Sequence, residues 1–339
     1  MKITTALGTL AFAAFLATNL ASADELNVIC SSEQDHCDLL VRTFEDKTGI
    51  DVAMVRKSTG ETLAQIRAEA GNPKVDVWYG GTGDPHIIAA GEGLTRKSGV
   101  NTDDLLGWAK NMVDITDGRS IGIYAGALGI GYNSELLAQK GLKPPLCWRD
   151  LADPSYAGEI QVANPNSSGT AYTELATFVQ LFGEEEGFKL LKKIGKNVNQ
   201  YTKSGSAPTK AAARGETTIA ISFIHGMVKQ AVAGFPIVAV SPCEGTGYEV
   251  GAVSIIKGTK NFQAAQKWVE YVLTPDAQAL AAQVGSFQVP SNSNSKMPPE
   301  APDLTTIKLI DYDFATYGSS ETRKRLLNRW DKDVKPASK

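Results

Sequence analysis

The chain lacks the features that mark nucleic-acid-binding proteins and the commonest nucleotide-dependent enzymes. Lysine and arginine total 34 against 37 aspartates and glutamates, so no basic excess points to nucleic acid. The basic run at residues 189–196 is most simply the solvated face of a helix. No Walker loop and no nucleophile elbow occur, and "GTGYEVG" and "GALGIG" do not fit a dinucleotide fingerprint. The charge balance and the missing motifs therefore exclude several classes without identifying one.

Long apolar runs are absent except at the N-terminus. Residues 1–23 combine a basic start at Lys2, an apolar middle and the small residues Ala21, Ser22 and Ala23. This arrangement is typical of a cleaved secretory signal peptide and predicts a mature chain that begins near Asp24. The apolar stretch is too short for a retained membrane span, and no cysteine follows the cleavage site to carry a lipid anchor. We therefore expect an exported, soluble protein.

Cysteine is scarce, with four residues in the whole chain. An even number in an exported protein predicts disulfides, although four cysteines allow three pairings. Cys30 and Cys37 would close a short loop between a strand and a helix, so we favour Cys30–Cys37 and Cys147–Cys243. Free buried thiols are the alternative. A zinc site is less favoured, because His36 beside Cys37 lacks the spaced ligand pairs that zinc requires.

The chain is long enough for two domains, and its periodicity predicts an α/β fold. Short apolar strands alternate with helices in the first part of the mature chain, which predicts a mostly parallel sheet with helices on both faces. The first helix is expected to start at Ser32 as its N-cap and to end at Gly49. The expected strands and helices cover residues 26–30, 31–49, 50–56, 58–71 and 75–81.

Small hydroxyl residues and glycines follow several expected strands, where the next helix begins. Backbone N–H groups and the positive end of a helix dipole meet at such turns, and ligands bind there in open α/β sheets. A single turn of this kind is usually a helix cap, but several on one sheet edge predict a site for an anion or for hydroxyl groups. The candidate hydroxyls belong to Ser31, Ser32, Ser58, Thr59, Thr82, Ser167, Ser168 and Thr170. Arg56 is a candidate cation, with a surface salt bridge as the alternative.

Two long extended stretches, residues 120–137 and 247–256, suit strands that cross between two lobes. The chain would leave the first lobe, build the second and return, which is the geometry of a two-strand hinge with a ligand cleft. We expect a first lobe from residues 24–123, a second lobe from 124–250, and a return to the first lobe with C-terminal helices over 251–339.

Several segments together resemble extracellular solute-binding proteins of ABC importers. They are "STGE", "DVWYGGTGDP", "IGIYAGALGIGYNSELL", "NPNSSGTAYT" and "PCEGTGYEVGAVSIIKG". The resemblance covers the mature chain and is strongest to the ferric-ion-binding group, in particular to its AfuA-type hexose-phosphate-binding offshoot. It implies a type II periplasmic-binding-protein fold and a monomer that delivers a small anionic solute to an ABC permease, without a cofactor or catalysis.

The resemblance also separates two ligand classes. Ferric-binding relatives ligate iron with adjacent tyrosines, whereas the matching strand end here contains Phe223 and no tyrosine pair. Iron(III) requires oxygen ligands, so we expect no metal site, although Tyr79, Tyr172 and Tyr201 could lie near a cleft. An iron-binding protein therefore stays the alternative, and a secreted phosphate-ester hydrolase is a minor one.

Sugar-phosphate-binding relatives carry a histidine at this strand end and a glutamate in the "CEGTG" turn, which match His225 and Glu244. These relatives place an acidic residue after the histidine, where this chain has Gly226, so the exact solute is open. Asp84 and Asn166 could join the sugar-binding groups. The alternatives are a histidine bonded inside the second lobe, a solvated turn at Glu244 and a helix N-cap at Asp84.

Overall fold

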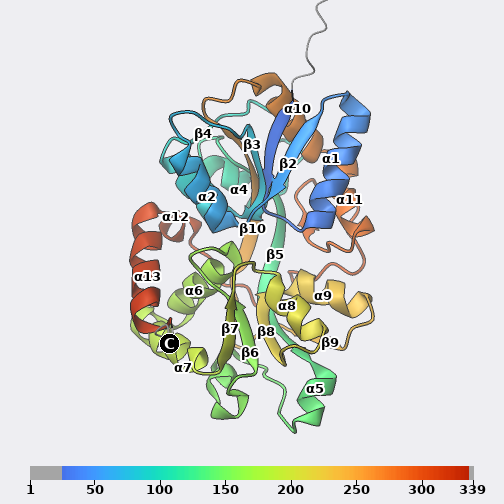
Figure 1. Cartoon of the computed structure of the whole chain (residues 1–339). Coiled ribbons are helices and arrows are strands. Elements are labelled where there is room, and N and C mark those ends of the chain that lie inside the picture. Colours follow the sequence, from blue (N-terminus) through green and yellow to red (C-terminus); the bar gives the residue numbers. More distant parts are fainter. Residues whose placement is uncertain (1–24, 336–339) are drawn as a thin grey trace, which may run out of the picture.

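The computed structural model describes residues 25–335, so the predicted signal peptide, residues 1–23, lies outside the described part. Within residues 25–335, no helix is both long enough and apolar enough to cross a membrane. The described chain forms two α/β halves that are stacked end to end and joined through the middle by two long strands (Figure 1). The strands form parallel and antiparallel pairs and lie in the order β2 (Val52–Arg56), β1 (Leu26–Cys30), β3 (Val77–Thr82), β10 (Tyr248–Ile256), β5 (Ile121–Asn133), β8 (Ile219–Phe223), β6 (Ile160–Ala163) and β7 (Val198–Thr202).

The first half is built on three parallel strands, with β1 paired to both β2 and β3. Its main core buries Leu26, Phe44, Val77 and Trp268 almost completely. Helices pack around these strands (Figure 1). The elements are β1 (Leu26–Cys30), α1 (Gln34–Thr48), β2 (Val52–Arg56), α2 (Thr59–Ala68), β3 (Val77–Thr82), α3 (Gly83–Gly91), β4 (Thr95–Arg96), α4 (Gly107–Ile115), α10 (Phe262–Val272), α11 (Pro275–Gln283) and β11 (Val289–Pro290).

The predicted crossing strands are β5 (Ile121–Asn133) and β10 (Tyr248–Ile256). Through residue Ala127, β5 pairs with β10, and from Leu128 onward it pairs with β8 of the second half. The same strand therefore belongs to both halves, as expected of a crossing strand, because its backbone hydrogen bonds pass from β10 to β8.

The second half surrounds a separate core that includes Trp148, Tyr172 and Phe178. Strands β6, β7 and β8 run parallel, while β8 and β9 pair antiparallel with β5. Its elements are α5 (Ser134–Gln139), the 3-10 helices η1 (Trp148–Ala152) and η2 (Pro154–Tyr156), β6 (Ile160–Ala163), α6 (Gly169–Phe182), α7 (Glu184–Gly195), β7 (Val198–Thr202), α8 (Ala207–Ala213), β8 (Ile219–Phe223), α9 (Ile224–Val232) and β9 (Ile237–Val240).

The C-terminal segment divides between the two halves, a division that the expected C-terminal helices of residues 251–339 left open. Helix α12 (Phe314–Tyr317) contacts α3 of the first half. Leu326 and Trp330 of α13 (Ser320–Asp333), together with Val334, lie in the core of the second half, and α13 runs beside α6 and α7 (Figure 1). The apolar face of α13 packs against the core of the second half, and sequence periodicity alone could not specify which core it would join.

Both predicted disulfides, Cys30–Cys37 and Cys147–Cys243, are present, so the free-thiol alternative is wrong. Gly49 ends α1 in the left-handed conformation, with φ of 68°, as predicted. The start of α1 was predicted wrongly. Its N-cap is Glu33, not Ser32, and the side chain of Ser32 is therefore not used to cap the helix.

Candidate functional site

A polar cavity of about 70 Å³ lies between the two halves. Its wall consists mainly of hydroxyl, glycine and charged residues, which suits a small polar solute. A second, larger cavity of about 730 Å³ lies beside Trp108, Tyr248 and Met297, but its wall is mainly apolar. The polar cavity is lined by Ser31, Ser32, Glu33, Arg56, Ser58, Thr59, Gly81, Thr82, Tyr124, Ser168, Gly169, Thr170, Gly205, Ser206, Ser222, Phe223, His225, Gly226, Glu249 and Gln288.

Six helices begin at the wall of this cavity. Their N-cap residues all line it, namely Glu33 for α1, Ser58 for α2, Thr82 for α3, Ser168 for α6, Ser206 for α8 and Phe223 for α9. Of these six, Ser168 caps its own helix by accepting a hydrogen bond from Ala171 N at 3.4 Å, and the other five side chains make no capping bond. The first N–H groups of a helix have no intrahelical acceptor and carry partial positive charge, so their convergence favours an anion.

Glycines let the wall segments approach one another closely. A Cβ atom on Gly169 would clash with the hydroxyls of Thr82 and Thr59, and a Cβ on Gly81 would also clash with Thr59. Gly81 has a φ of 81°, a left-handed conformation that glycine adopts without strain. Hydroxyls from β3, α2 and the start of α6 are thereby gathered in a small volume.

Thr82 is the clearest unused donor in the cavity wall. Its side chain is 1% exposed, and its hydroxyl has no hydrogen-bond partner among the described residues. A buried polar group without a partner costs about 1–3 kcal/mol, and such groups in native structures usually serve a purpose. A ligand oxygen in the cavity would supply the missing acceptor.

Among the described residues, Arg56 is the one lysine or arginine in the cavity wall. It stands at the end of β2, where its Nε donates to Ser32 O at 3.1 Å and its Nη2 donates to Ser204 Oγ at 3.2 Å. Burial lowers the pKa of the guanidinium, while the nearby carboxylates of Glu33 and Glu61 oppose this shift. Arg56 therefore supplies a fixed positive charge, and it also bridges the two halves. The alternative role for Arg56, a surface salt bridge, is not observed, because its partners are a backbone carbonyl and a serine hydroxyl.

His225 and Glu249 form a hydrogen-bonded pair in the cavity wall. His225 Nε2 lies 3.2 Å from Glu249 Oε1, and both side chains are largely buried. The imidazole stacks beside the Phe223 ring, at 5.8 Å between centroids and 14° between planes. It also packs against β5, where a Cβ on Gly126 would lie 2.7 Å from the ring. Together the two side chains offer a donor and an acceptor to a ligand hydroxyl.

Glu33 is an acidic residue in the wall of an otherwise donor-rich cavity. Lys229 and Lys210, from α9 and α8 of the other half, lie 2.9 and 3.5 Å from its carboxylate oxygens. Burial opposes ionisation of Glu33, but these two lysines outweigh that effect and hold the pKa of the carboxyl below its usual value. Lys229 also contacts Asp35. These ion pairs join the two halves directly and neutralise Glu33.

Eight of the twelve predicted ligand-binding residues line the cavity, and four do not. The eight are Ser31, Ser32, Ser58, Thr59, Thr82, Ser168, Thr170 and His225. The structure therefore brings together the hydroxyl residues of both halves at one place. The four others, which are not part of the cavity wall, are Asp84, Asn166, Ser167 and Glu244.

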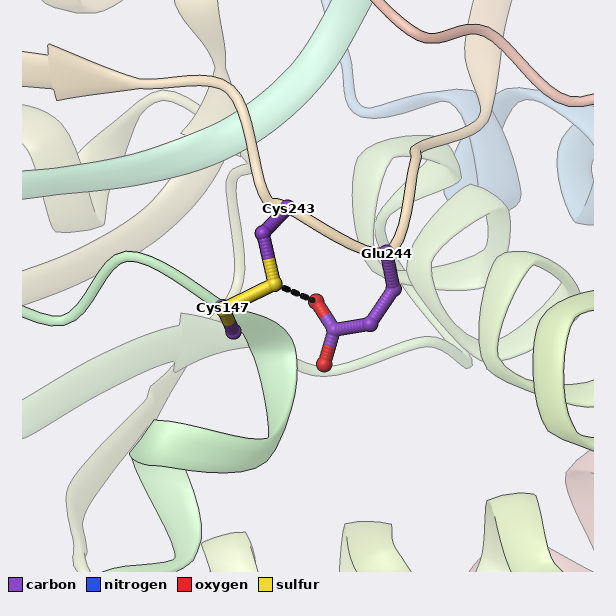
Figure 2. A group of neighbouring side chains, drawn as sticks. All are labelled: Cys147, Cys243 and Glu244. Atoms are coloured by element: carbon purple, nitrogen blue, oxygen red, sulfur yellow. Dashed lines mark hydrogen bonds between the residues drawn. A yellow bond between two sulfur atoms is a disulfide. The ribbon is translucent and has the colours of Figure 1, made fainter.

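Glu244 lies at the disulfide and not at the cavity. Its two carboxylate oxygens accept hydrogen bonds from Trp148 N at 2.8 Å and Arg149 N at 3.0 Å, which closes the start of helix η1. Figure 2 shows the carboxylate beside the bond between Cys147 and Cys243. Because both sulfurs are joined to each other, this group of side chains does not form a metal site. The glutamates that line the cavity are Glu33 and Glu249, and Glu249 lies five positions after Glu244 in the chain.

Asp84, Asn166 and Ser167 lie outside the cavity wall. Asp84 is 1% exposed and accepts from Tyr312 Oη at 3.1 Å, and burial raises its pKa to about 6. Asn166 donates to Asp331 at 3.1 Å. Ser167 contributes its backbone, because Gly60 N of the first half donates to Ser167 O at 3.0 Å. These residues hold the surroundings of the cavity together.

The tyrosines that sequence analysis considered for iron do not line the cavity. Tyr79 belongs to the core of the first half, while Tyr172 and Tyr201 pack in the second half. Burial raises the pKa of all three hydroxyls, so the phenolate form that binds iron is disfavoured. Tyr124 does line the cavity, but its oxygen accepts from Gly81 N at 2.7 Å and burial likewise raises its pKa.

The cavity wall also contains polar residues that were not predicted from the sequence, namely Glu33, Tyr124, Ser206, Ser222, Glu249 and Gln288. Glu249 lies within crossing strand β10, which we expected to serve as a connection only. The alternating residues of β10 could have indicated its position, because Glu249 pairs with Gly126 on β5, and a glycine leaves room beside the glutamate side chain. Gln288 precedes the short strand β11, and nothing in its local sequence marks it.

Comparison with known proteins supports the architecture. Residues 89–316, more than half of the chain, match the model of a family described as bacterial extracellular solute-binding protein. An uncharacterized protein of Haemophilus influenzae is 42% identical over 333 residues, which cover 96% of each chain.

Solved structures of periplasmic binding proteins share the fold of this chain. The periplasmic binding protein AfuA of Actinobacillus pleuropneumoniae, solved with fructose 6-phosphate bound, is 43% identical, with a TM-score of 0.90 over 92% of this chain and 99% of that one. The periplasmic binding protein P5PA is 36% identical, with a TM-score of 0.88 over the same shares. Iron-bound HitA of Pseudomonas aeruginosa, at 22% identity, a TM-score of 0.73 and coverage of 90% and 98%, shows the fold alone. The periplasmic-binding-protein fold predicted from the sequence is confirmed, and the chain belongs to the bacterial extracellular solute-binding protein family.

Proposed function

We propose that this protein is the periplasmic solute-binding component of an ABC importer and that it captures a small phosphorylated solute between its two lobes. The chain would be exported by the signal peptide of residues 1–23, and its two disulfides suit an oxidising compartment. It would act as a monomer that binds its solute without turnover or a cofactor and then docks transiently with the permease.

The observation that carries this proposal is the convergence of six helix N-termini on one cavity. A phosphate needs many donors, and hydrogen bonds to charged groups contribute about 1.5–3 kcal/mol each. The hydroxyls of Thr82, Thr59, Ser168 and Thr170 supply such donors, and Arg56 supplies a full charge. Because Glu33 is paired with lysines, it does not leave a net repulsive charge facing the anion.

The pair formed by His225 and Glu249 supports an organic phosphate over inorganic phosphate. Their imidazole and carboxylate can bind the hydroxyls of a sugar or polyol whose phosphate is held by the donors of the cavity wall. A side chain on neighbouring Gly226 would meet open space, so the wall is wider there. AfuA, the relative described above, was solved with fructose 6-phosphate, and a relative in Salmonella typhimurium, 24% identical over half of this chain, is a phosphoglycerate transport regulatory protein.

Closure of the two lobes follows from where the groups lie. Ser32, Thr59 and Thr82 belong to the first half, and Ser168, Thr170 and His225 belong to the second. A solute that contacts both sets stabilises the arrangement in which the halves meet and shifts the population toward it. The contacts between Gly60 N and Ser167 O and between Lys229 and Glu33 would hold the closed protein for recognition by the permease.

Isothermal titration calorimetry tests the proposal against its alternatives. We expect saturable one-to-one binding of fructose 6-phosphate or glycerol 3-phosphate, and no release of phosphate from either compound. At 100-fold excess over the dissociation constant, a bound solute should add about 2.7 kcal/mol to the free energy of unfolding. Binding of ferric salt with a phenolate charge-transfer band, in place of these phosphates, would support the iron-binding alternative. Catalytic release of phosphate would support the hydrolase alternative.

A further inference from the structure

Two adjacent serines at the end of β1 line the cavity, but their hydroxyl groups are bonded differently. Trp78 Nε1 donates to Ser31 Oγ at 3.0 Å, and Ser31 Oγ lies 3.1 Å from Thr62 Oγ1. Thr62 in turn donates to the carbonyl oxygen of Ser58 at 3.1 Å. An indole N–H only donates and a carbonyl only accepts, so the hydroxyl hydrogen of Ser31 must go to Thr62. Ser31 has no hydrogen left for an anion.

Ser32 is bonded to one side chain, that of His36 on the first turn of α1. Its Oγ lies 3.3 Å from His36 Nδ1. The imidazole is 2% exposed, and its other nitrogen, Nε2, has no hydrogen-bond partner among the described residues. The edge of the ring packs toward Tyr79, with 6.0 Å between the centroids. His36 therefore reaches the cavity only through Ser32.

The neutral imidazole can carry its proton on either nitrogen. With the proton on Nε2, a buried N–H would have no acceptor, and Nδ1 would take the hydrogen of Ser32. With the proton on Nδ1, the N–H has Ser32 Oγ as its acceptor and only a lone pair is left unpaired. Buried N–H groups without an acceptor are rare, so the second tautomer is favoured. In that tautomer the hydrogen of Ser32 is free to point into the cavity.

We propose that His36 is a positioning residue that donates from Nδ1 to Ser32 and so makes Ser32 a hydrogen-bond donor to a phosphate oxygen of the solute. This inference rests on the proposed function. It gives the two serines distinct roles, because Ser31 ties the end of β1 to Trp78 and Thr62 while Ser32 contacts the ligand.

The surroundings of His36 support a fixed orientation. The disulfide from Cys37 to Cys30 ties the first turn of α1 to the end of β1, on either side of Ser32. The charged groups that face the ring are Asp35 and Glu33 beside it on the chain and Lys229 from α9. Lys229 pairs with both carboxylates, so no unpaired charge next to the ring replaces Ser32 as its partner.

Nitrogen-15 NMR of the wild-type protein measures the tautomer directly and needs no ligand. The chain has three histidines, so the imidazole signals can be assigned with few variants. We expect His36 to be protonated at Nδ1 with an unprotonated Nε2. A proton on Nε2 would overturn the proposal, because Ser32 would then be the donor to the imidazole.

A double-mutant cycle measures the coupling through binding of inorganic phosphate and fructose 6-phosphate by calorimetry. His36→Phe keeps a planar ring and should weaken the binding of each ligand by about tenfold, a loss of about 1.4 kcal/mol of binding free energy. His36→Asn retains a donor near the position of Nδ1 and should recover most of the affinity. In a Ser32→Ala background, His36→Phe should change the affinity by less than about twofold.

The outcomes separate the two proposals. An equal loss from His36→Phe in both backgrounds, or no recovery with asparagine, would show a purely structural role for His36. If His36→Phe does not fold, the asparagine variant and the NMR measurement still decide the question. A wild-type protein that binds neither probe would contradict the proposed function, while the tautomer would still report the direction of the bond between His36 and Ser32.

Discussion

Replacing Thr82 by valine should stabilise the ligand-free protein and weaken solute binding at the same time. The threonine hydroxyl is buried in the cavity wall and has no partner among the described residues. Valine has the same shape and lacks the hydroxyl, so the unfavourable burial of an unpaired polar group disappears. The two effects have opposite signs because the same hydroxyl is unpaired without the solute and paired with it.

The expected sizes follow from the two states of this group. Relief of a buried unpaired hydroxyl should raise the free energy of unfolding by about 1 kcal/mol. Loss of a hydrogen bond to a charged phosphate should cost about 1.5–3 kcal/mol, which raises the dissociation constant by about tenfold to a hundredfold. Urea denaturation without ligand and calorimetry with fructose 6-phosphate measure the two quantities independently.

Thr95→Val is the matched control. Thr95 is a strand residue that is 2% exposed and whose hydroxyl also lacks a partner among the described residues, but it lies outside the polar cavity. We expect a similar gain in stability and no change in affinity. If Thr82→Val lowered stability and left the affinity unchanged, the hydroxyl would be structural, and the assignment of the cavity as a phosphate site would lose its best-placed donor.

Three further predictions concern charged groups. Burial raises the pKa of Glu174 to about 8 from a usual value of 4.5, so the folded protein binds the extra proton and stability falls as pH rises between these values. The free energy of unfolding of the wild-type protein should therefore fall by roughly 3 kcal/mol between pH 4.5 and 7, and Glu174→Gln should remove this fall. If the free energies of unfolding of both proteins changed with pH in parallel, the raised pKa of Glu174 would be contradicted. Glu249→Ala should weaken the binding of fructose 6-phosphate by about tenfold and the binding of inorganic phosphate much less. Glu244→Ala should lower the melting temperature and leave both affinities within about twofold. The reverse pattern would identify Glu244 as the sugar-binding group. Lys229→Met leaves Glu33 with Lys210 alone, so we expect about tenfold weaker phosphate binding at low salt, and unchanged affinity in calorimetry would refute a role for this ion pair.

Much of the fold could be predicted from the sequence because its determinants are local. The apolar residues of β1 and β6, the left-handed Gly49 and the small residues of β5 each define an element through neighbours in the chain. Glu244 shows the limit of such reasoning. A glutamate beside a cysteine suited a ligand-binding turn, yet its oxygens are used by the backbone of η1, which lies far away in the sequence.

The alternation of strands and helices, the hydroxyl-rich turns and the absence of a tyrosine pair can be read from residue type and spacing alone. Which hydroxyl groups remain free to donate depends on how distant segments pack. Ser31 and Ser32 are equivalent as letters, but Trp78 and Thr62 consume one hydroxyl and His36 orients the other. The packing of distant segments likewise brings six helix N-termini to one cavity, because the direction of a hydrogen bond or a dipole depends on partners that lie far apart in the chain.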